Sequence, residues 1–152
     1  MSNVVPLVPP ATHLIPEDQV TPLRLSYILS ATYTDHLVED EGDIYISDGV
    51  AFPLWLRVDV EAKLIVMFTY IEAESDAPAS WLSKVNELNA SIILPQFWYR
   101  DGCLWGRDWL TYDGGLSTRH LIKMLKRFAG AFRTAVEDVG LCPPNSSPKP
   151  DS

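Results

Sequence analysis

The segment from Asp59 to Lys63 fits the D-x-E-x-K pattern of metal-dependent nucleases. In such a site, two carboxylates hold a magnesium ion and the lysine steadies a phosphate. That chemistry needs carboxylates held rigidly on a strand, whereas here the pattern predicts a tight turn between two long strands. The chain is also acidic and shows no basic groove. A small metal-dependent hydrolase using Asp59 and Glu61 is therefore the alternative function and not the leading one.

Other residues that could do chemistry do not form a recognisable site in the sequence. The acidic run of residues 35–43 lacks the loop spacing of a calcium-binding hand, so we interpret it as a charged edge hairpin. No two of the three histidines have metal-ligand spacing, and Gly114-Gly115 lacks the lysine of a phosphate loop. We therefore expect no catalytic residues, no metal and no cofactor.

Three predicted strands place a tryptophan beside an arginine on one side, because side chains alternate across a strand. The pairs are Trp55 with Arg57, Trp98 with Arg100, and Trp105 with Arg107. Tryptophan and arginine are the residues enriched at binding hot spots, so these six are the candidate partner-binding residues. A core face with snorkelling arginines stays open as the alternative. A homodimer would cover such a face as well as another protein would.

The hydrophobic pattern predicts the elements that carry these residues. Two long strands, 53–60 and 63–74, flank the turn, and the second is apolar on both sides, which is typical of a strand covered on both faces. Helices are expected at 21–33, 78–90 and 117–139, where capping residues or apolar spacing indicate them. Further strands are expected at 36–40, 43–47, 96–100 and 104–111, with hairpin turns at Glu41-Gly42 and Asp101-Gly102.

These elements predict an α+β fold: a single antiparallel sheet of about five strands with three helices, in the order α-β-β-β-α-β-β-α. Short turns force antiparallel pairing, and the helices should cover mainly one face. We expect this domain to span residues 20–141, after a proline-rich arm at 1–19 and before a disordered polar tail at 142–152. The apolar residues of the arm could dock on the domain or on a partner.

Composition excludes several classes of function. The length of 152 residues fits one domain, and the net charge of −8 argues against nucleic-acid binding, which needs a basic surface. No apolar stretch is long enough to cross a bilayer, so we expect no membrane partner. The two cysteines, Cys103 and Cys142, do not form a disulfide framework, and a reduced cytoplasmic protein is the simple interpretation.

Several local motifs, in their order and spacing, resemble the YbjN family over about residues 20–140. These bacterial proteins are described as sensory-transduction regulators. The motifs are an F-P-x-W-x-R-V-D strand at 52–59, an L-x-x-x-F-T-Y strand at 64–70, V-N-x-L-N at 85–89 and G-G-L-S at 114–117. Each motif is weak alone. The chain departs from the family pattern in its proline-rich lead and in the two tryptophans of its last long strand.

The resemblance implies a fold similar to that of type III secretion chaperones, which are small, acidic, often dimeric proteins that bind other proteins. It also implies no enzyme activity, and it gives no catalytic residues to carry over. The leading hypothesis is therefore a non-catalytic protein-interaction module, chaperone-like or regulatory, that acts through the aromatic sheet face as a homodimer or with an unidentified protein.

Overall fold

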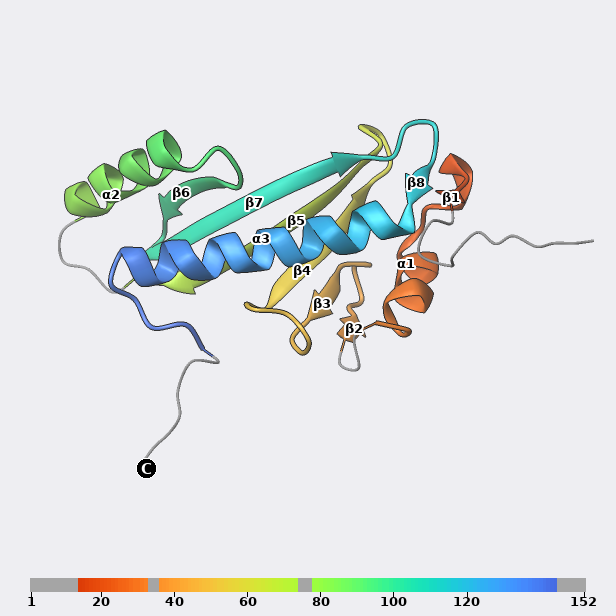
Figure 1. The fold of residues 1–152 in the computed structure, drawn as a ribbon, viewed down its shortest axis with the longest axis horizontal. Coiled ribbons are helices and arrows are strands. Elements are labelled where there is room, and N and C mark those ends of the chain that lie inside the picture. Colours follow the sequence, from red (N-terminus) through yellow and green to blue (C-terminus); the bar gives the residue numbers. More distant parts are fainter. Residues whose placement is uncertain (1–13, 33–35, 74–77, 145–152) are drawn as a thin grey trace, which may run out of the picture.

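A six-stranded antiparallel sheet forms the centre of the computed structural model, which describes residues 14–32, 36–73 and 78–144. The strands lie in the order β2-β3-β4-β5-β7-β6 (Figure 1). Their bounds are β2 His36–Val38, β3 Ile44–Ile46, β4 Leu54–Asp59, β5 Leu64–Glu72, β6 Gln96–Arg100 and β7 Cys103–Thr111. The tight turn predicted at 59–63 joins β4 to β5, and Lys63 adopts the left-handed conformation there with φ 57°.

The prediction of a single sheet of about five strands is wrong in its strand count. Four strands of this sheet precede the second helix where the predicted order has three, because the three-residue strands β2 and β3 both pair into the sheet. A separate two-stranded sheet joins β1 (Leu14–Ile15) to β8 (Leu116–Ser117). The two-residue strands β1 and β8 carry too little alternation to be recognised from a pattern, whereas β2 and β3 lie within the strands expected at 36–40 and 43–47. The α+β class and the antiparallel pairing are confirmed.

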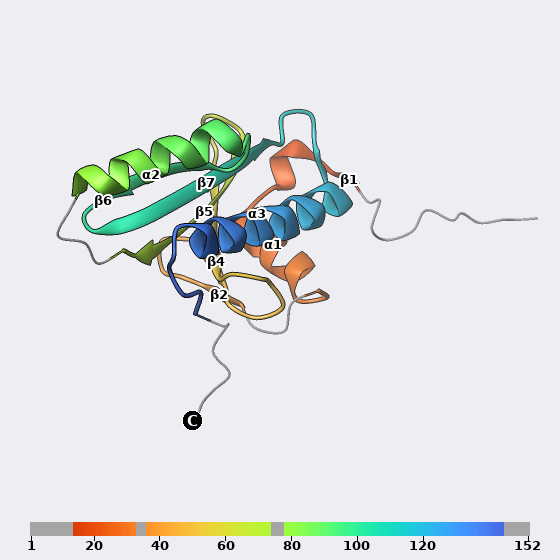
Figure 2. The same ribbon diagram turned by 60° about the vertical axis from the view of Figure 1, so that its left-hand side comes forward.

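Three α-helices accompany the sheet: α1 (Pro22–Leu29), α2 (Pro78–Ser91) and α3 (Thr118–Asp138). The predicted caps close their first turns, since Thr21 Oγ1 accepts from the Arg24 amide at 3.1 Å and Ser117 Oγ accepts from the His120 amide at 3.2 Å. Helix α1 ends earlier than the predicted residue 33. Figure 2 shows α3 lying along the sheet with the end of α1 beside it.

The core lies between the sheet and α3, and Phe132 occupies its centre. The Phe132 ring contacts Phe52, Phe97 and Phe128 at centroid distances of 4.8, 6.1 and 6.3 Å. It also sits against Gly106 of β7, where a Cβ atom would lie 2.6 Å from the ring. A side chain at position 106 would therefore push α3 off the sheet.

The outer edge of β6 is closed by a side chain of α2. Asn89 Nδ2 donates to the Phe97 carbonyl at 2.9 Å, and the Phe97 amide donates to Asn89 Oδ1 at 3.0 Å. The amide group thus takes the place of a neighbouring strand at this residue, which hinders pairing with another chain. This contact gives the last asparagine of the V-N-x-L-N motif a structural role.

Part of the predicted proline-rich arm belongs to the fold. Residues 14–19 form β1 and the 3-10 turn η2 (Glu17–Gln19), and Ile15 is buried in the core. Residues 1–13 and 145–152 lie outside the described residues, so the rest of the predicted arm and most of the predicted tail are not covered. Within the described ranges, no helix is both long and apolar enough to cross a bilayer.

Candidate interaction surface

The two faces of the sheet differ in burial. On β5, Ile65, Met67 and Thr69 are buried against the helices, whereas the alternating residues from Leu64 to Tyr70 are half-buried or exposed. We call the face turned away from α3 the open face. The predicted strand with two apolar sides therefore has one side in the core and one side on this surface.

Five aromatic rings form a continuous row across the open face, one from each of β3, β4, β5, β7 and β6. In spatial order they are Tyr45, Trp55, Tyr70, Trp105 and Trp98, and we call this set the aromatic row. Successive ring centroids lie 4.7, 5.6, 4.7 and 5.8 Å apart. Strand register produces the row, because three of the four neighbouring pairs are direct cross-strand partners.

Arginine side chains lie over these rings. The guanidinium carbons of Arg107 and Arg100 lie 5.1 Å from the Trp98 centroid and 5.5 Å from the Trp105 centroid. The guanidinium of Arg57 lies 4.8 Å from Phe68, the direct partner of Trp55. Such contacts hold the cations flat against the aromatic surface, where they stay accessible to a partner.

Arg57 is also bound by a nearly buried carboxylate. Its Nε and Nη2 donate to the two carboxylate oxygens of Asp43 at 3.0 and 2.7 Å. These hydrogen bonds raise the pKa of Arg57 above its ordinary value, so the guanidinium keeps its positive charge. Because Asp43 neutralises this arginine, Arg57 supports the aromatic surface more than it adds charge to it.

The structure places all six predicted partner-binding residues on the open face. The three tryptophans lie in the aromatic row and the three arginines lie over rings of the same face. Whether they bind a partner stays a prediction. Sequence reasoning missed Tyr45, whose only signal was the alternation in Ile44-Tyr45-Ile46. Trp109 extends the surface and is 44% exposed beside a shallow hollow of about 290 Å³.

The D-x-E-x-K segment has a structural role in the turn. Asp59 Oδ1 accepts a hydrogen bond from the Ala62 amide at 3.0 Å, and the Lys63 ammonium contacts Glu17 and not a carboxylate of its own turn. No group of three or more histidine, cysteine or acidic side chains suited to a metal occurs in the described parts of the chain. The structure therefore gives no support to the alternative hydrolase.

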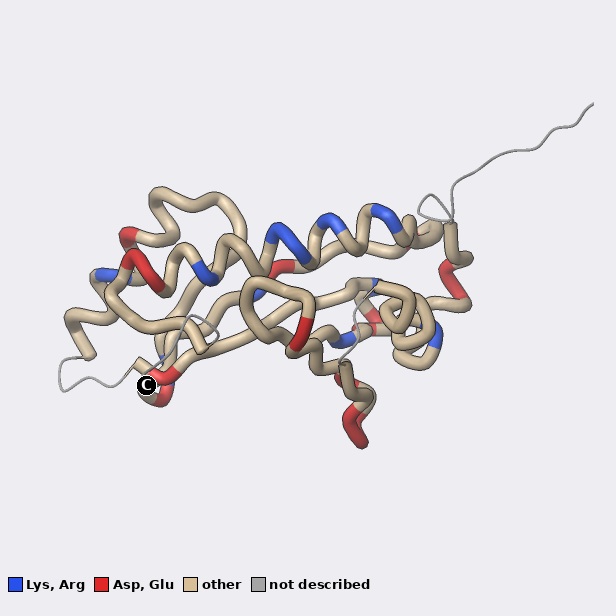
Figure 3. The backbone as a smooth tube through the Cα atoms, turned by 60° about the horizontal axis from the view of Figure 1, so that its bottom comes forward, with Lys and Arg blue, Asp and Glu red and all other residues tan. Residues whose placement is uncertain are grey.

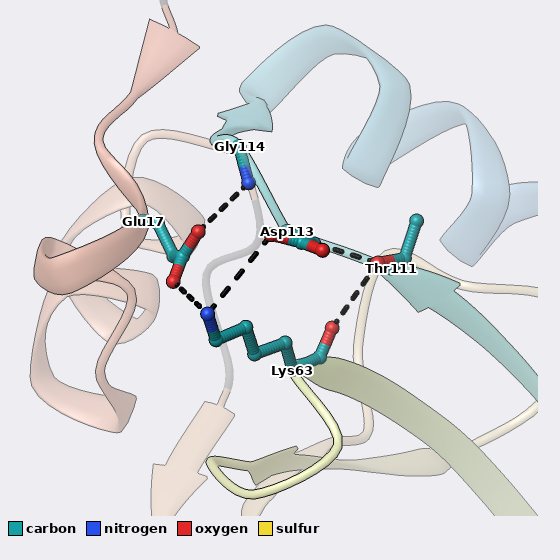
Figure 4. Close-up of polar contacts among 5 residues, drawn as sticks. All are labelled: Glu17, Lys63, Thr111, Asp113 and Gly114. Carbon is teal, nitrogen blue, oxygen red and sulfur yellow. Dashed lines mark hydrogen bonds and ion pairs between the residues drawn. The ribbon is translucent and has the colours of Figure 1, made fainter.

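Lys63 connects three distant segments (Figure 4). Its ammonium pairs with Glu17 of η2 and lies 4.0 Å from Asp113 in the loop before β8. Glu17 also accepts a hydrogen bond from the Gly114 amide at 2.9 Å. The cluster fixes the N-terminal segment to the β4–β5 turn and to the loop that leads into α3.

This cluster predicts how stability responds to acid. The pKa of Glu17 lies below its ordinary value of 4.5, chiefly because of the Lys63 hydrogen bond and then the Gly114 amide. The folded state thus binds this proton less tightly than the unfolded state. The stabilisation is complete above pH 4.5 and is lost as the pH falls through the folded pKa. We expect Glu17→Gln to lower the melting temperature at neutral pH. At a pH below the folded-state pKa of Glu17, the same substitution should leave the melting temperature unchanged.

Thermal denaturation at both pH values checks this expectation. Glu61→Gln, an exposed change of the same type in the β4–β5 turn, is the control and should leave the melting temperature unchanged at either pH. An equal loss for Glu17→Gln at both pH values would show that the carboxylate charge is not what stabilises the cluster.

The cysteine on the open face is a poor nucleophile. Burial, and then Glu72 and Asp101, raise the pKa of the Cys103 thiol above its ordinary value. A raised pKa lowers the thiolate fraction at neutral pH, and the thiolate is the reactive form. Cys103 and Cys142, both among the described residues, do not form a disulfide bond.

Comparison with known proteins gives a family and a matching solved fold. The family model YbjN, described as "Putative bacterial sensory transduction regulator", matches residues 25–140. The crystal structure of "YbjN, a putative transcription regulator from E. coli" has a similar fold, with a TM-score of 0.67 and 14% sequence identity. The similarity covers 80% of this chain and 95% of that one. None of the curated proteins matches the chain. Because the family model spans most of its length, the chain belongs to the YbjN family.

Proposed function

We propose that the chain is a non-catalytic protein-interaction module, regulatory or chaperone-like, that acts through the open face, where a second copy of the chain packs to form a homodimer. The observation that carries the proposal is the aromatic row, which reaches across five strands on the sheet face turned away from α3. The family description as a regulator supports a role of this kind.

The chemistry of the open face suits a protein partner. Tryptophan and tyrosine supply large contact area at low cost in conformational entropy, and together with arginine they dominate the energetics of protein interfaces. A continuous aromatic surface of this kind is uncommon on a protein that stays alone. The face also lacks a strong net charge, since Asp43 neutralises Arg57 and Asp101 lies 3.7 Å from Arg100. Contacts would therefore be mainly apolar and cation–π in character.

The size and composition of the face fit a second copy. β5 and β7 are nine residues long, which is about 30 Å, and five strands are about 24 Å wide. Because β3, β4 and β6 are shorter, the footprint is on the order of 500 Å², which is near the lower end of what each partner buries in a specific interface. A two-fold interface must be self-complementary, and this face presents both rings and the arginines that stack on rings. A chaperone-like role, as in type III secretion chaperones, would use the same surface.

Light scattering on the full chain tests the proposal. We expect a mass twice the 17.0 kDa of one chain, and a shift to monomer for Trp98→Ala and Arg107→Glu. Lys126→Glu, a charge reversal on the exposed side of α3, is the control and should leave the dimer intact. Circular dichroism confirms that each variant folds. A monomeric wild type that also binds no protein in a pull-down dependent on Trp98 would contradict the proposal.

A further inference from the structure

An apolar groove runs between α1 and the start of α3, on the helix side of the molecule. It has a volume of about 340 Å³. Ile28 and Ala31 line it from α1 and the turn that follows, and Thr118 and Ile122 line it from α3. Arg119 and Lys123 also line it and bring two positive charges to the apolar surface. We call this feature the helical groove.

A stripe of cations lies beside the helical groove. Arg119, Lys123 and Lys126 are exposed on α3 at spacings of four and three residues, which puts them on one side of the helix. Figure 3 shows basic residues recurring along the length of α3. None of the three takes part in an ion pair with another described residue, although Arg127 and Arg133 of the same helix pair with Asp108 and Glu137.

The positive charge of the stripe is unusual near the start of a helix and unusual in an acidic chain. The first turn of α3 contains no acidic residue, although the positive end of the helix dipole favours acids there and disfavours cations. The chain as a whole carries a net charge of −8, yet these three cations are grouped together. The stripe therefore groups three exposed cations, none of which lies within 4.0 Å of a carboxylate among the described residues.

The dimensions of the helical groove select the kind of partner. Its volume is at the lower end of the range for small-molecule sites, which suits a few apolar side chains better than a whole cofactor. The stripe spans residues 119–126, whose first and last members are about 10 Å apart along the helix axis, or two turns. Three cations on a strongly acidic chain are too few for nucleic acid, whose binding depends on many phosphate contacts.

We propose that the helical groove binds an acidic amphipathic helix of another protein. Apolar side chains of that helix enter between Ile28 and Ile122, and its carboxylates face Arg119, Lys123 and Lys126. Binding of a helix in an apolar groove through residues at spacings of three and four is a common mode of recognition. This surface lies on the side of the sheet opposite the open face, so it does not depend on the function proposed for that face.

Fluorescence anisotropy with a labelled synthetic helix tests the proposal on the full chain. The probe carries leucines along one side and glutamates beside them, and a second probe has glutamine in place of each glutamate. We expect saturable binding of the acidic probe and at least about tenfold weaker binding of the neutral one, because charge-assisted contacts are lost. Added salt should weaken the acidic probe only.

Matched variants locate the site. Lys123→Glu and Lys126→Glu should each weaken binding of the acidic probe about tenfold or more, and Ile122→Ser should weaken both probes. Lys126 does not line the helical groove, so its variant reports on charge without disturbing helix packing. Lys84→Glu makes the same charge change on α2, away from the helical groove, and should have no effect. Unchanged binding in both lysine variants, or binding to vesicles of anionic lipid without binding of the acidic probe, would overturn the proposal.

Discussion

Replacing Phe132 by alanine is expected to lower the free energy of unfolding by about 3–5 kcal/mol. The ring is fully buried at the point where α3 meets the sheet, and it contacts three other phenylalanines. Its removal leaves a cavity between two rigid elements that cannot close together, so both the burial energy and the packing contacts are lost. Chemical denaturation with urea measures the change from the shift in midpoint at a constant slope.

An exposed aromatic residue provides the comparison for Phe132. Tyr27 on α1 is 79% exposed, and Tyr27→Ala should change the free energy of unfolding by no more than about 0.5 kcal/mol. If Phe132→Ala and Tyr27→Ala lowered the free energy of unfolding equally, Phe132 would not be central to the core. The contact between α3 and β7 would then be wrong.

The helices could be predicted well because their signals are local. The apolar stripe of α3, from Leu121 to Val136, recurs at helical spacing and is buried as expected. The caps at Thr21 and Ser117 likewise depend on residues a few positions apart. Local chemistry of this kind is fully present in the sequence, so it predicts where a helix begins and which side faces the core.

The strands show what the sequence leaves undetermined. Alternation groups the side chains of β5 into two sets, but both sets are apolar, so the pattern cannot say which one the helices cover. The pairing of β1 with β8 joins segments about 100 residues apart through two residues each. The Glu17 to Lys63 ion pair depends on that distant pairing. No local signal specifies these contacts.

The candidate surface was only partly predictable for the same reason. Alternation put each tryptophan in phase with an arginine on its own strand, and the pairing of the strands in the sheet places all six on one face. The aromatic row itself depends on register, since Tyr70 meets Trp105 only because β7 lies between β5 and β6. Tyr45 joins the row through a three-residue strand. Such contacts follow from the strand order of the whole sheet.

Replacing Gly106 by alanine is expected to lower the free energy of unfolding by roughly 1–2 kcal/mol. The added Cβ would lie 2.6 Å from Cδ1 and 2.7 Å from Cε1 of Phe132, well inside van der Waals contact. Overpacking of this kind costs about 1–3 kcal/mol, which exceeds the gain of up to about 1 kcal/mol from restricting a glycine in the unfolded chain. Urea denaturation of both proteins measures the difference.

Gly130→Ala is the matched control, because it makes the same chemical change in the middle of α3. No atom lies within 4 Å of the added Cβ there, so only the benefit to helix formation remains. We expect a gain of about 0.5–1 kcal/mol. Two glycine-to-alanine changes with opposite signs would show that close approach of Phe132, and not glycine chemistry as such, determines the outcome at position 106.

A second change at position 132 identifies the partner in the clash. In a Phe132→Leu background the shorter side chain leaves room for a Cβ on β7, so the cost of Gly106→Ala should fall towards zero. The coupling free energy from this double-mutant cycle should reach about 0.5–2 kcal/mol. If the effects of Gly106→Ala and Phe132→Leu on the free energy of unfolding add to within about 0.3 kcal/mol in the double variant, the two residues do not contact each other. The position assigned to α3 on the sheet would then be wrong.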